Sequence, residues 1–141
     1  MRAEMTPHWA GDYLGIPFVP HGRSEDGLDC WGLVQKVLME QFETFLPSLD
    51  NAYHELSVKE NADAVAEAIL TLPIVLTETP LEGDIVLLTL TGIPAHVGVY
   101  CIVDKIPMVL HADPLGRCGS RLSRISDPNI ASRIEGYYHV I

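Results

Sequence analysis

Residues 27–34 read GLDCWGLV, and this stretch marks the start of the clearest helix in the sequence. Aspartate is a residue type that caps helix N-termini, because its side-chain oxygen accepts a hydrogen bond from a backbone N–H of the first turn. After Asp29, apolar residues recur with the i, i+3, i+4, i+7 spacing of an amphipathic helix. They are Cys30, Leu33, Val34, Val37, Leu38, Phe42 and Phe45. The stretch therefore predicts a helix with a cysteine in its first turn.

Two further helices are expected around this one. Thr6-Pro7 supplies a cap followed by proline at the first helical position, which predicts a short helix that ends before residue 15. Residues 15–27 contain prolines and glycines that break both regular periods, so we expect an ordered loop there. Residues 57–70 open with a Ser-x-x-Glu capping box and continue with helical apolar spacing, which predicts a helix that ends near Leu70.

The second half of the chain changes to short runs rich in β-branched residues, separated by turn signals. The predicted strands are Ile74–Thr77, Ile85–Leu90, Val97–Val103, Met108–Ala112 and Ile134–Val140. Helices followed by strands indicate an α+β domain, with N-terminal helices packed on a mostly antiparallel sheet of about five strands. At 141 residues, without repeats or a linker, the chain is expected to form one domain over 1–141.

Charge and hydropathy exclude several classes of protein. The chain carries 19 acidic and 9 basic residues, a formal charge of −10, and such a negative field repels nucleic acid and anionic membrane surfaces. No stretch approaches the roughly 20 apolar residues of a spanning helix, and the N-terminus MRAEMTPHWAG lacks the apolar run of a secretory signal. We therefore expect no nucleic-acid partner, no membrane span and no signal peptide.

The three cysteines have different settings, and they show no metal-binding or disulfide spacing. Cys30 is expected in the first turn of a helix, where backbone amides and the helix dipole favour a thiolate, the reactive form of the side chain. Cys101 alternates with valines in a predicted strand, which is typical of a core residue. Cys118 is the second candidate for a reactive thiol, because Arg117 and Arg121 flank it and favour a thiolate, but nothing around it supplies a base.

A thiolate nucleophile needs a base, and of the six histidines His96 and His111 are the candidates, because they lie at the ends of two successive predicted strands. His96 precedes Val97 and shares a strand face with Gly98, whose missing side chain would let the Cys30 helix approach closely. His111 closes the run Met-Val-Leu-His of the next predicted strand. If these strands pair as a hairpin through residues 104–107, His111 can hydrogen-bond His96 and fix its tautomer, which gives a Cys-His-His relay.

Four motifs in order, GLDCWGLV, LEGDIVLL, AHVGVY and VLHAD, resemble the NlpC family of papain-like cell-wall cysteine peptidases. The resemblance spans roughly Trp9 to Asp113. It implies a papain-like peptidase fold with Cys30 as nucleophile, His96 as base and His111 as the residue that orients the base. It also implies hydrolysis of peptidoglycan stem peptides, by family analogy between D-glutamate and the diamino acid, without a cofactor or metal.

The segments GRSEDGLDCWGLV and RIEGYYHVI look more like the phage-tail and gene-transfer-agent branch of this family. This narrower resemblance implies a tail-associated cell-wall hydrolase. Such a protein is assembled in the cytoplasm with tail-tip or baseplate partners and meets the wall or periplasm only at infection. The lack of a signal peptide is compatible with that route.

Residues around the cysteine in this motif are expected to contact the substrate; they are Phe18, His21, Arg23, Asp29 and Trp31. Relatives usually carry Pro-Tyr where this chain has Pro17-Phe18, so a hydroxyl beside the cysteine is missing here. His21 is expected to substitute for it in part. A second departure, Glu82-Gly83-Asp84 in place of Pro-Gly-Asp, has no evident chemical consequence.

Two other functions stay open. A tail-tip structural protein could keep the fold without catalysis, and Phe18 is the feature that favours this alternative. A zinc hydrolase that uses Cys30, His96, His111 and Asp113 is less favoured, because the chain has no His-Glu-x-x-His or comparable close ligand pair.

Overall fold

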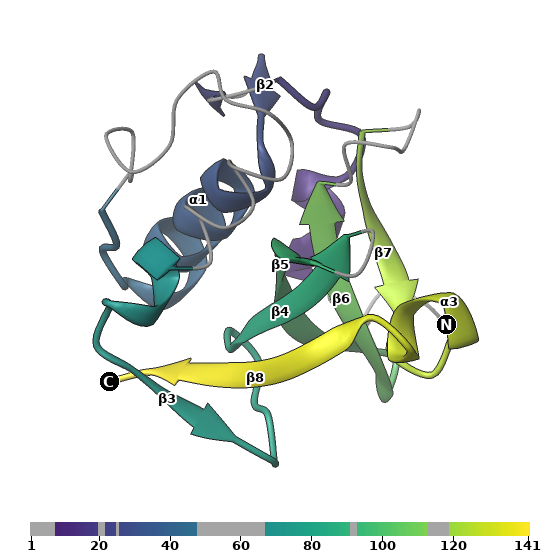
Figure 1. The fold of residues 1–141 in the computed structure, drawn as a ribbon. Helices are drawn as coiled ribbons and strands as arrows, with labels where there is room; N and C mark the ends of the chain where they lie inside the picture. Colours follow the sequence, from purple (N-terminus) through teal and green to yellow (C-terminus); the bar gives the residue numbers. More distant parts are fainter. Residues whose placement is uncertain (1–7, 20–21, 25, 48–66, 91–92, 113–118) are drawn as a thin grey trace.

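The structure is a computed structural model that describes residues 8–19, 22–24, 26–47, 67–90, 93–112 and 119–141. Figure 1 shows one long helix beside a sheet, with the C-terminus next to the start of β3. The elements in chain order are η1 (Trp9–Tyr13), β1 (Arg23–Ser24), β2 (Gly27–Leu28), α1 (Cys30–Phe42), β3 (Ile74–Thr77), β4 (Ile85–Leu90), β5 (Ile93–Val103), β6 (Ile106–Ala112), β7 (Ser120–Arg124), α3 (Pro128–Ala131) and β8 (Ile134–Val140).

Helix α1 begins where the sequence predicts. Asp29 is the N-cap, and its Oδ1 accepts a hydrogen bond of 2.7 Å from the backbone N–H of Gly32. The predicted end was wrong, because the helix stops at Phe42 and Phe45 is 80% exposed. Glu43 adopts the left-handed conformation with φ 51°, and its N–H bonds back to the Leu38 carbonyl, which closes the last turn.

The N-terminal helix differs from the predicted one. Thr6 and Pro7 lie outside the described residues, and the described helix η1 is a 3-10 helix whose cap is His8. The His8 Nδ1 accepts a hydrogen bond of 3.0 Å from the Ala10 N–H. A side-chain nitrogen of histidine thus does what the predicted threonine oxygen would have done. Of the predicted helix over 57–70, only residues 67–70 are described, and they are helical.

The sheet has six strands in the order β3-β8-β4-β5-β6-β7, and every neighbouring pair is antiparallel. The predictions for β3, β4 and β8 are confirmed to the residue. Strands β5 and β6 start earlier than predicted, and β7 was missed. Strand β7, Ser-Arg-Leu-Ser-Arg, is an edge strand with one apolar residue, so it carries no alternating hydrophobic signal.

A tight hairpin joins β5 to β6, as the sequence predicted. Asp104 and Lys105 form its turn, both with positive φ (51° and 68°), the backbone twist that a two-residue hairpin loop requires. The resulting register pairs Val103 with Ile106 and Gly98 with His111. This register brings the two histidine-bearing strands side by side.

The loop before Cys30 is more regular than predicted, because it contains the small hairpin of β1 and β2. Phe18 forms an isolated parallel bridge with Leu28. Two backbone hydrogen bonds secure that bridge, from the Val19 N–H to the Leu28 carbonyl at 3.1 Å and from the Leu28 N–H to the Pro17 carbonyl at 3.0 Å. Strand β2, which leads into α1, is therefore paired with β1 on one side and with residues 17–19 on the other.

The main core lies between α1 and the sheet, and α1 packs on β5 and β6. Val97, Val99 and Cys101 from β5 join α1 side chains there. The opposite sheet face carries a smaller cluster that includes Tyr100 and Val109. The α+β prediction is therefore confirmed. Among the described helices, none is long and apolar enough to cross a membrane.

Candidate active site

Cys30 is the first residue of α1, and its side chain is half-buried against the main core. The helix dipole and the first-turn amides favour negative charge at this position, so the setting suits a thiolate. Asp29 is only 5% exposed and its carboxylate caps the same turn. The cap fixes where the helix starts, and hence where the sulfur lies.

Cys101 has the opposite setting. It is fully buried within the main core, and this burial, with a smaller contribution from the Glu82 charge, raises the pKa of its thiol to about 12. A thiol in that environment is protonated at neutral pH and inaccessible to substrate. Cys101 is therefore a core residue, as predicted, whereas Cys118 lies outside the described residues.

His96 and His111 form a buried hydrogen-bonded pair. The Nε2 of His96 lies 2.8 Å from the Nδ1 of His111, with ring centroids 5.1 Å apart and planes at 71°. Their side chains are 1% and 0% exposed. This is the contact that the sequence predicted, and it leaves Nδ1 as the nitrogen through which His96 can exchange a proton with a thiol.

A β-bulge precedes His96. Leu88 pairs with His96 and Thr89 pairs with Pro94, so Ala95 is an extra residue on β5. Bulges bend a strand locally and re-aim the neighbouring side chain, and they are frequent beside active sites. The irregular part of the strand therefore lies directly before the residue expected to act as base.

The role expected of Gly98 was wrong. A Cβ at this position would lie 2.5 Å from the Val109 Cγ2, 2.8 Å from the Leu110 carbonyl oxygen and 3.1 Å from the His111 Cβ. All three atoms belong to β6, so the glycine makes room for that strand rather than for the Cys30 helix. It thereby allows the close approach of His111.

A third polar side chain belongs to this cluster and was not predicted. The His111 Nε2 lies 2.9 Å from the Oγ of Ser123, on β7. Three consecutive strands therefore contribute a chain that runs from His96 through His111 to Ser123. The missing signal is the missed edge strand itself, since only its register brings Ser123 beside His111.

The histidine pair does not resemble a zinc site. The two nitrogens that face each other are engaged in one hydrogen bond, so they do not converge on a shared ion. Within the part of the chain that the structure describes, no group of three His, Cys, Asp or Glu side chains could hold a metal. Asp113, the fourth residue of the zinc alternative, lies outside those residues.

Comparison with known families identifies the fold. The model of the NlpC/P60 family matches residues 15–126, most of the chain. The chain belongs to the NlpC/P60 family. Members of this family have a papain-like fold and are generally cysteine peptidases that act on peptidoglycan. A search of curated proteins found no match.

Two solved structures share this fold at low sequence identity. One is the NlpC/p60 domain of the peptidoglycan hydrolase SagA, with 16% identity, a TM-score of 0.58, and coverage of 93% of this chain and 92% of that one. The other, described as similar to a lipoprotein of the NLP/P60 family, comes from Staphylococcus aureus. It has 23% identity and a TM-score of 0.56, and the matched region covers 94% of this chain and 39% of the staphylococcal chain.

The residues predicted to contact substrate are placed differently within this NlpC/P60 domain. Trp31 is wholly buried and its Nε1 donates a hydrogen bond of 2.9 Å to the Pro47 carbonyl, so it belongs to the core and not to an open surface. Phe18 is half-buried against the same core. Arg23 contributes its backbone to β1, opposite Leu28, and His21 lies outside the described residues.

The Gly-Asp motif before β4 has a structural role in this domain. Asp84 is 2% exposed, and its Oδ2 accepts a hydrogen bond of 2.8 Å from the Leu81 N–H. Its Oδ1 lies 2.7 Å from the Nδ1 of His139 on β8. The aspartate therefore fixes the turn before β4 and ties it to a neighbouring strand.

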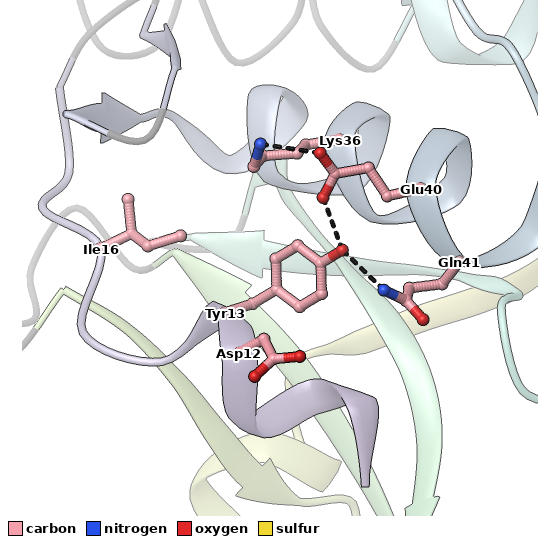
Figure 2. A pocket seen from close by; sticks show the side chains of 6 residues that line it. All are labelled: Asp12, Tyr13, Ile16, Lys36, Glu40 and Gln41. Atoms are coloured by element: carbon pink, nitrogen blue, oxygen red, sulfur yellow. Dashed lines mark hydrogen bonds and ion pairs between the residues drawn. The ribbon is translucent and has the colours of Figure 1, made fainter.

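A separate pocket of about 450 Å³ lies between η1 and α1, and Figure 2 shows its polar contacts. Tyr13 donates to the Glu40 carboxylate at 2.7 Å and accepts from Gln41 at 3.0 Å, while Lys36 pairs with Glu40 at 3.0 Å. Burial raises the pKa of Tyr13 to about 12. The two hydrogen bonds of Tyr13 therefore join η1 to α1.

Proposed function

We propose that the protein is a cysteine peptidase that hydrolyses peptide bonds in the stem peptides of bacterial peptidoglycan. Cys30 is the nucleophile, His96 the base and His111 the residue that orients the base. The observation that carries the proposal is the buried 2.8 Å contact between the two histidines, on strands that pack beneath the helix opened by Cys30.

The proposed chemistry follows from these groups. His96 takes the thiol proton, and the thiolate attacks the carbonyl carbon of the scissile peptide bond. As the tetrahedral intermediate collapses, the imidazolium gives its proton to the departing amine, leaving a thioester on Cys30. Water, activated by His96, then hydrolyses the thioester and releases the carboxylic acid. His111 holds His96 in position throughout.

The substrate class is supported by membership of the NlpC/P60 family and by the likeness to a domain of a peptidoglycan hydrolase. We further propose that the protein acts as a tail-associated wall hydrolase, with tail-tip or baseplate partners. That part rests on the resemblance of the segments at residues 22–34 and 133–141 alone.

Mass spectrometry of muropeptides after incubation with the purified protein tests the activity and identifies the bond cut. We expect new peptide ends, with a cut between D-glutamate and the diamino acid as the family analogy implies. Cys30→Ala and His96→Ala should abolish them, whereas Cys101→Ala should keep most of the activity.

Zymography on purified peptidoglycan separates this proposal from the alternative of a structural tail-tip protein. A folded wild-type protein that clears no peptidoglycan from several types of wall would favour the structural alternative. Equal losses in Cys30→Ala and Cys101→Ala, with both variants folded, would refute the assignment of the nucleophile.

A further inference from the structure

We propose that Ser123 is a positioning residue of this site, which acts through His111 to keep the His111 Nδ1 unprotonated. The inference rests on the proposed function, because it concerns the base of that same reaction. Its basis is the contact of 2.9 Å between the His111 Nε2 and the Ser123 Oγ, at the end of the chain that begins at His96.

The protonation of His96 and the protonation of His111 are coupled along this chain. A neutral imidazole has one N–H donor and one acceptor nitrogen, so a proton on one nitrogen of His111 determines the role of the other. If the Nε2 of His111 carries the proton and donates to Ser123, its Nδ1 accepts from His96. If the Nδ1 carries the proton, His111 must instead donate to the Nε2 of His96.

Only the first arrangement suits a base at His96. It puts the His96 proton on Nε2 and leaves Nδ1 with a lone pair for the thiol proton. When His96 becomes an imidazolium, both of its nitrogens carry protons, and His111 can still accept from Nε2. In the second arrangement the His96 Nδ1 is already protonated, and an imidazolium would bring two N–H groups face to face across 2.8 Å.

A serine hydroxyl can accept or donate, so Ser123 allows the first arrangement by giving the His111 Nε2–H an acceptor. A protonated His96 then selects that arrangement, because an imidazolium can only donate to the His111 Nδ1. The Nε2–H requires an acceptor, because His111 is completely buried and a buried N–H without an acceptor costs free energy. Ser123 lies on β7 two positions beyond Arg121, the residue opposite His111, so it reaches the ring from the same strand face. The strand register thus supplies the acceptor.

Nitrogen-15 NMR of histidine side chains tests the inference without any substrate. In the wild-type protein we expect His111 to be protonated at Nε2 and not at Nδ1. Ser123→Thr keeps the hydroxyl and should keep this tautomer, whereas Ser123→Val has the same shape without the hydroxyl and should populate both tautomers. Both replacements suit a strand, so the comparison isolates one oxygen atom.

Kinetics on muropeptides give the second measurement. Ser123→Val and Ser123→Ala should lower kcat on the order of 10-fold with little change in KM, the size of effect typical of partners that orient a functional histidine, and Ser123→Thr should recover most of the loss. Ser120→Ala is the matched control. Ser120 lies on the same strand but bonds the Tyr13 carbonyl and the Ile16 N–H, so its loss should lower stability and leave the His111 tautomer unchanged.

An unchanged His111 tautomer in both Ser123→Val and Ser123→Ala would overturn the inference. So would an equal tautomer change in Ser120→Ala, since general loosening of β7 would then be the cause. The NMR result decides the role of Ser123 even if the wild-type protein cleaves no peptidoglycan, an outcome that would count against the proposed function alone.

Discussion

Brief treatment with iodoacetamide at pH 6 is expected to alkylate Cys30 and to leave Cys101 unmodified. Cys101 is fully buried, and the pKa of its thiol is raised to about 12. At pH 6 its thiolate fraction is on the order of 10³ lower than that of an ordinary thiol with a pKa of about 8.5. Burial reduces its reactivity further, so Cys101 serves as an internal reference.

The pH dependence of Cys30 labelling tests the proposed ion pair. The thiolate fraction of an ordinary thiol with a pKa of about 8.5 rises about 75-fold between pH 6 and pH 8. If the first turn of α1 and a protonated His96 stabilise the Cys30 thiolate, labelling should rise by less than about threefold over this range, because most of the thiolate is already present at pH 6.

Peptide mapping by mass spectrometry after timed quenching measures these rates for each cysteine. His96→Ala should restore a steep rise with pH, whereas His139→Ala should not, since His139 is half exposed and bonds Asp84 instead. A rise of about 75-fold in the wild-type protein would refute the thiolate–imidazolium pair at Cys30.

Three substitutions test other parts of the structure. Asp29→Ala removes the cap of α1 and should lower the free energy of unfolding by about 1 kcal/mol in urea titrations, whereas Asp29→Ser should keep most of it; equal stability of all three proteins would contradict the capping role. Gly98→Ala puts a Cβ 2.5 Å from the Val109 Cγ2, so it should cost about 1–3 kcal/mol of stability and reduce activity by displacing His111, whereas Gly11→Ala, with nothing within 4 Å, should do neither. Phe18→Tyr should raise kcat with little change in KM if a hydroxyl there donates to the oxyanion, an interaction whose loss typically costs about 10² to 10³ in turnover. An unchanged or lower kcat would identify Phe18 as a packing residue, and His21→Ala would be the next variant to measure.

Local signals in the sequence were sufficient for the parts of the site that lie on regular elements. Asp29 and the apolar spacing after it predicted the start of α1, because capping and amphipathic packing depend on residues within a few positions of one another. The hairpin between β5 and β6 was predicted for the same reason, and its register accounts for the contact between His96 and His111.

Local signals failed where a partner distant in the sequence decides the outcome. A glycine at position 98 suggests that another element comes close, but the sequence does not show that this neighbour is β6. Trp31 was predicted to contact the substrate, and only the packing around it, which leaves it 0% exposed, shows that it is a core residue. In both cases the deciding atoms belong to a different part of the chain.

Ser123 shows this limit most clearly. Its strand has a single apolar residue, because an edge strand buries little of its surface, so nothing in the pattern marks it as a strand. The sequence by itself determined which helix carries the cysteine and which two histidines share a hairpin. The tertiary structure alone decided that a serine from β7 closes the chain of hydrogen bonds behind them, since strand pairing is set by the packing of the whole sheet.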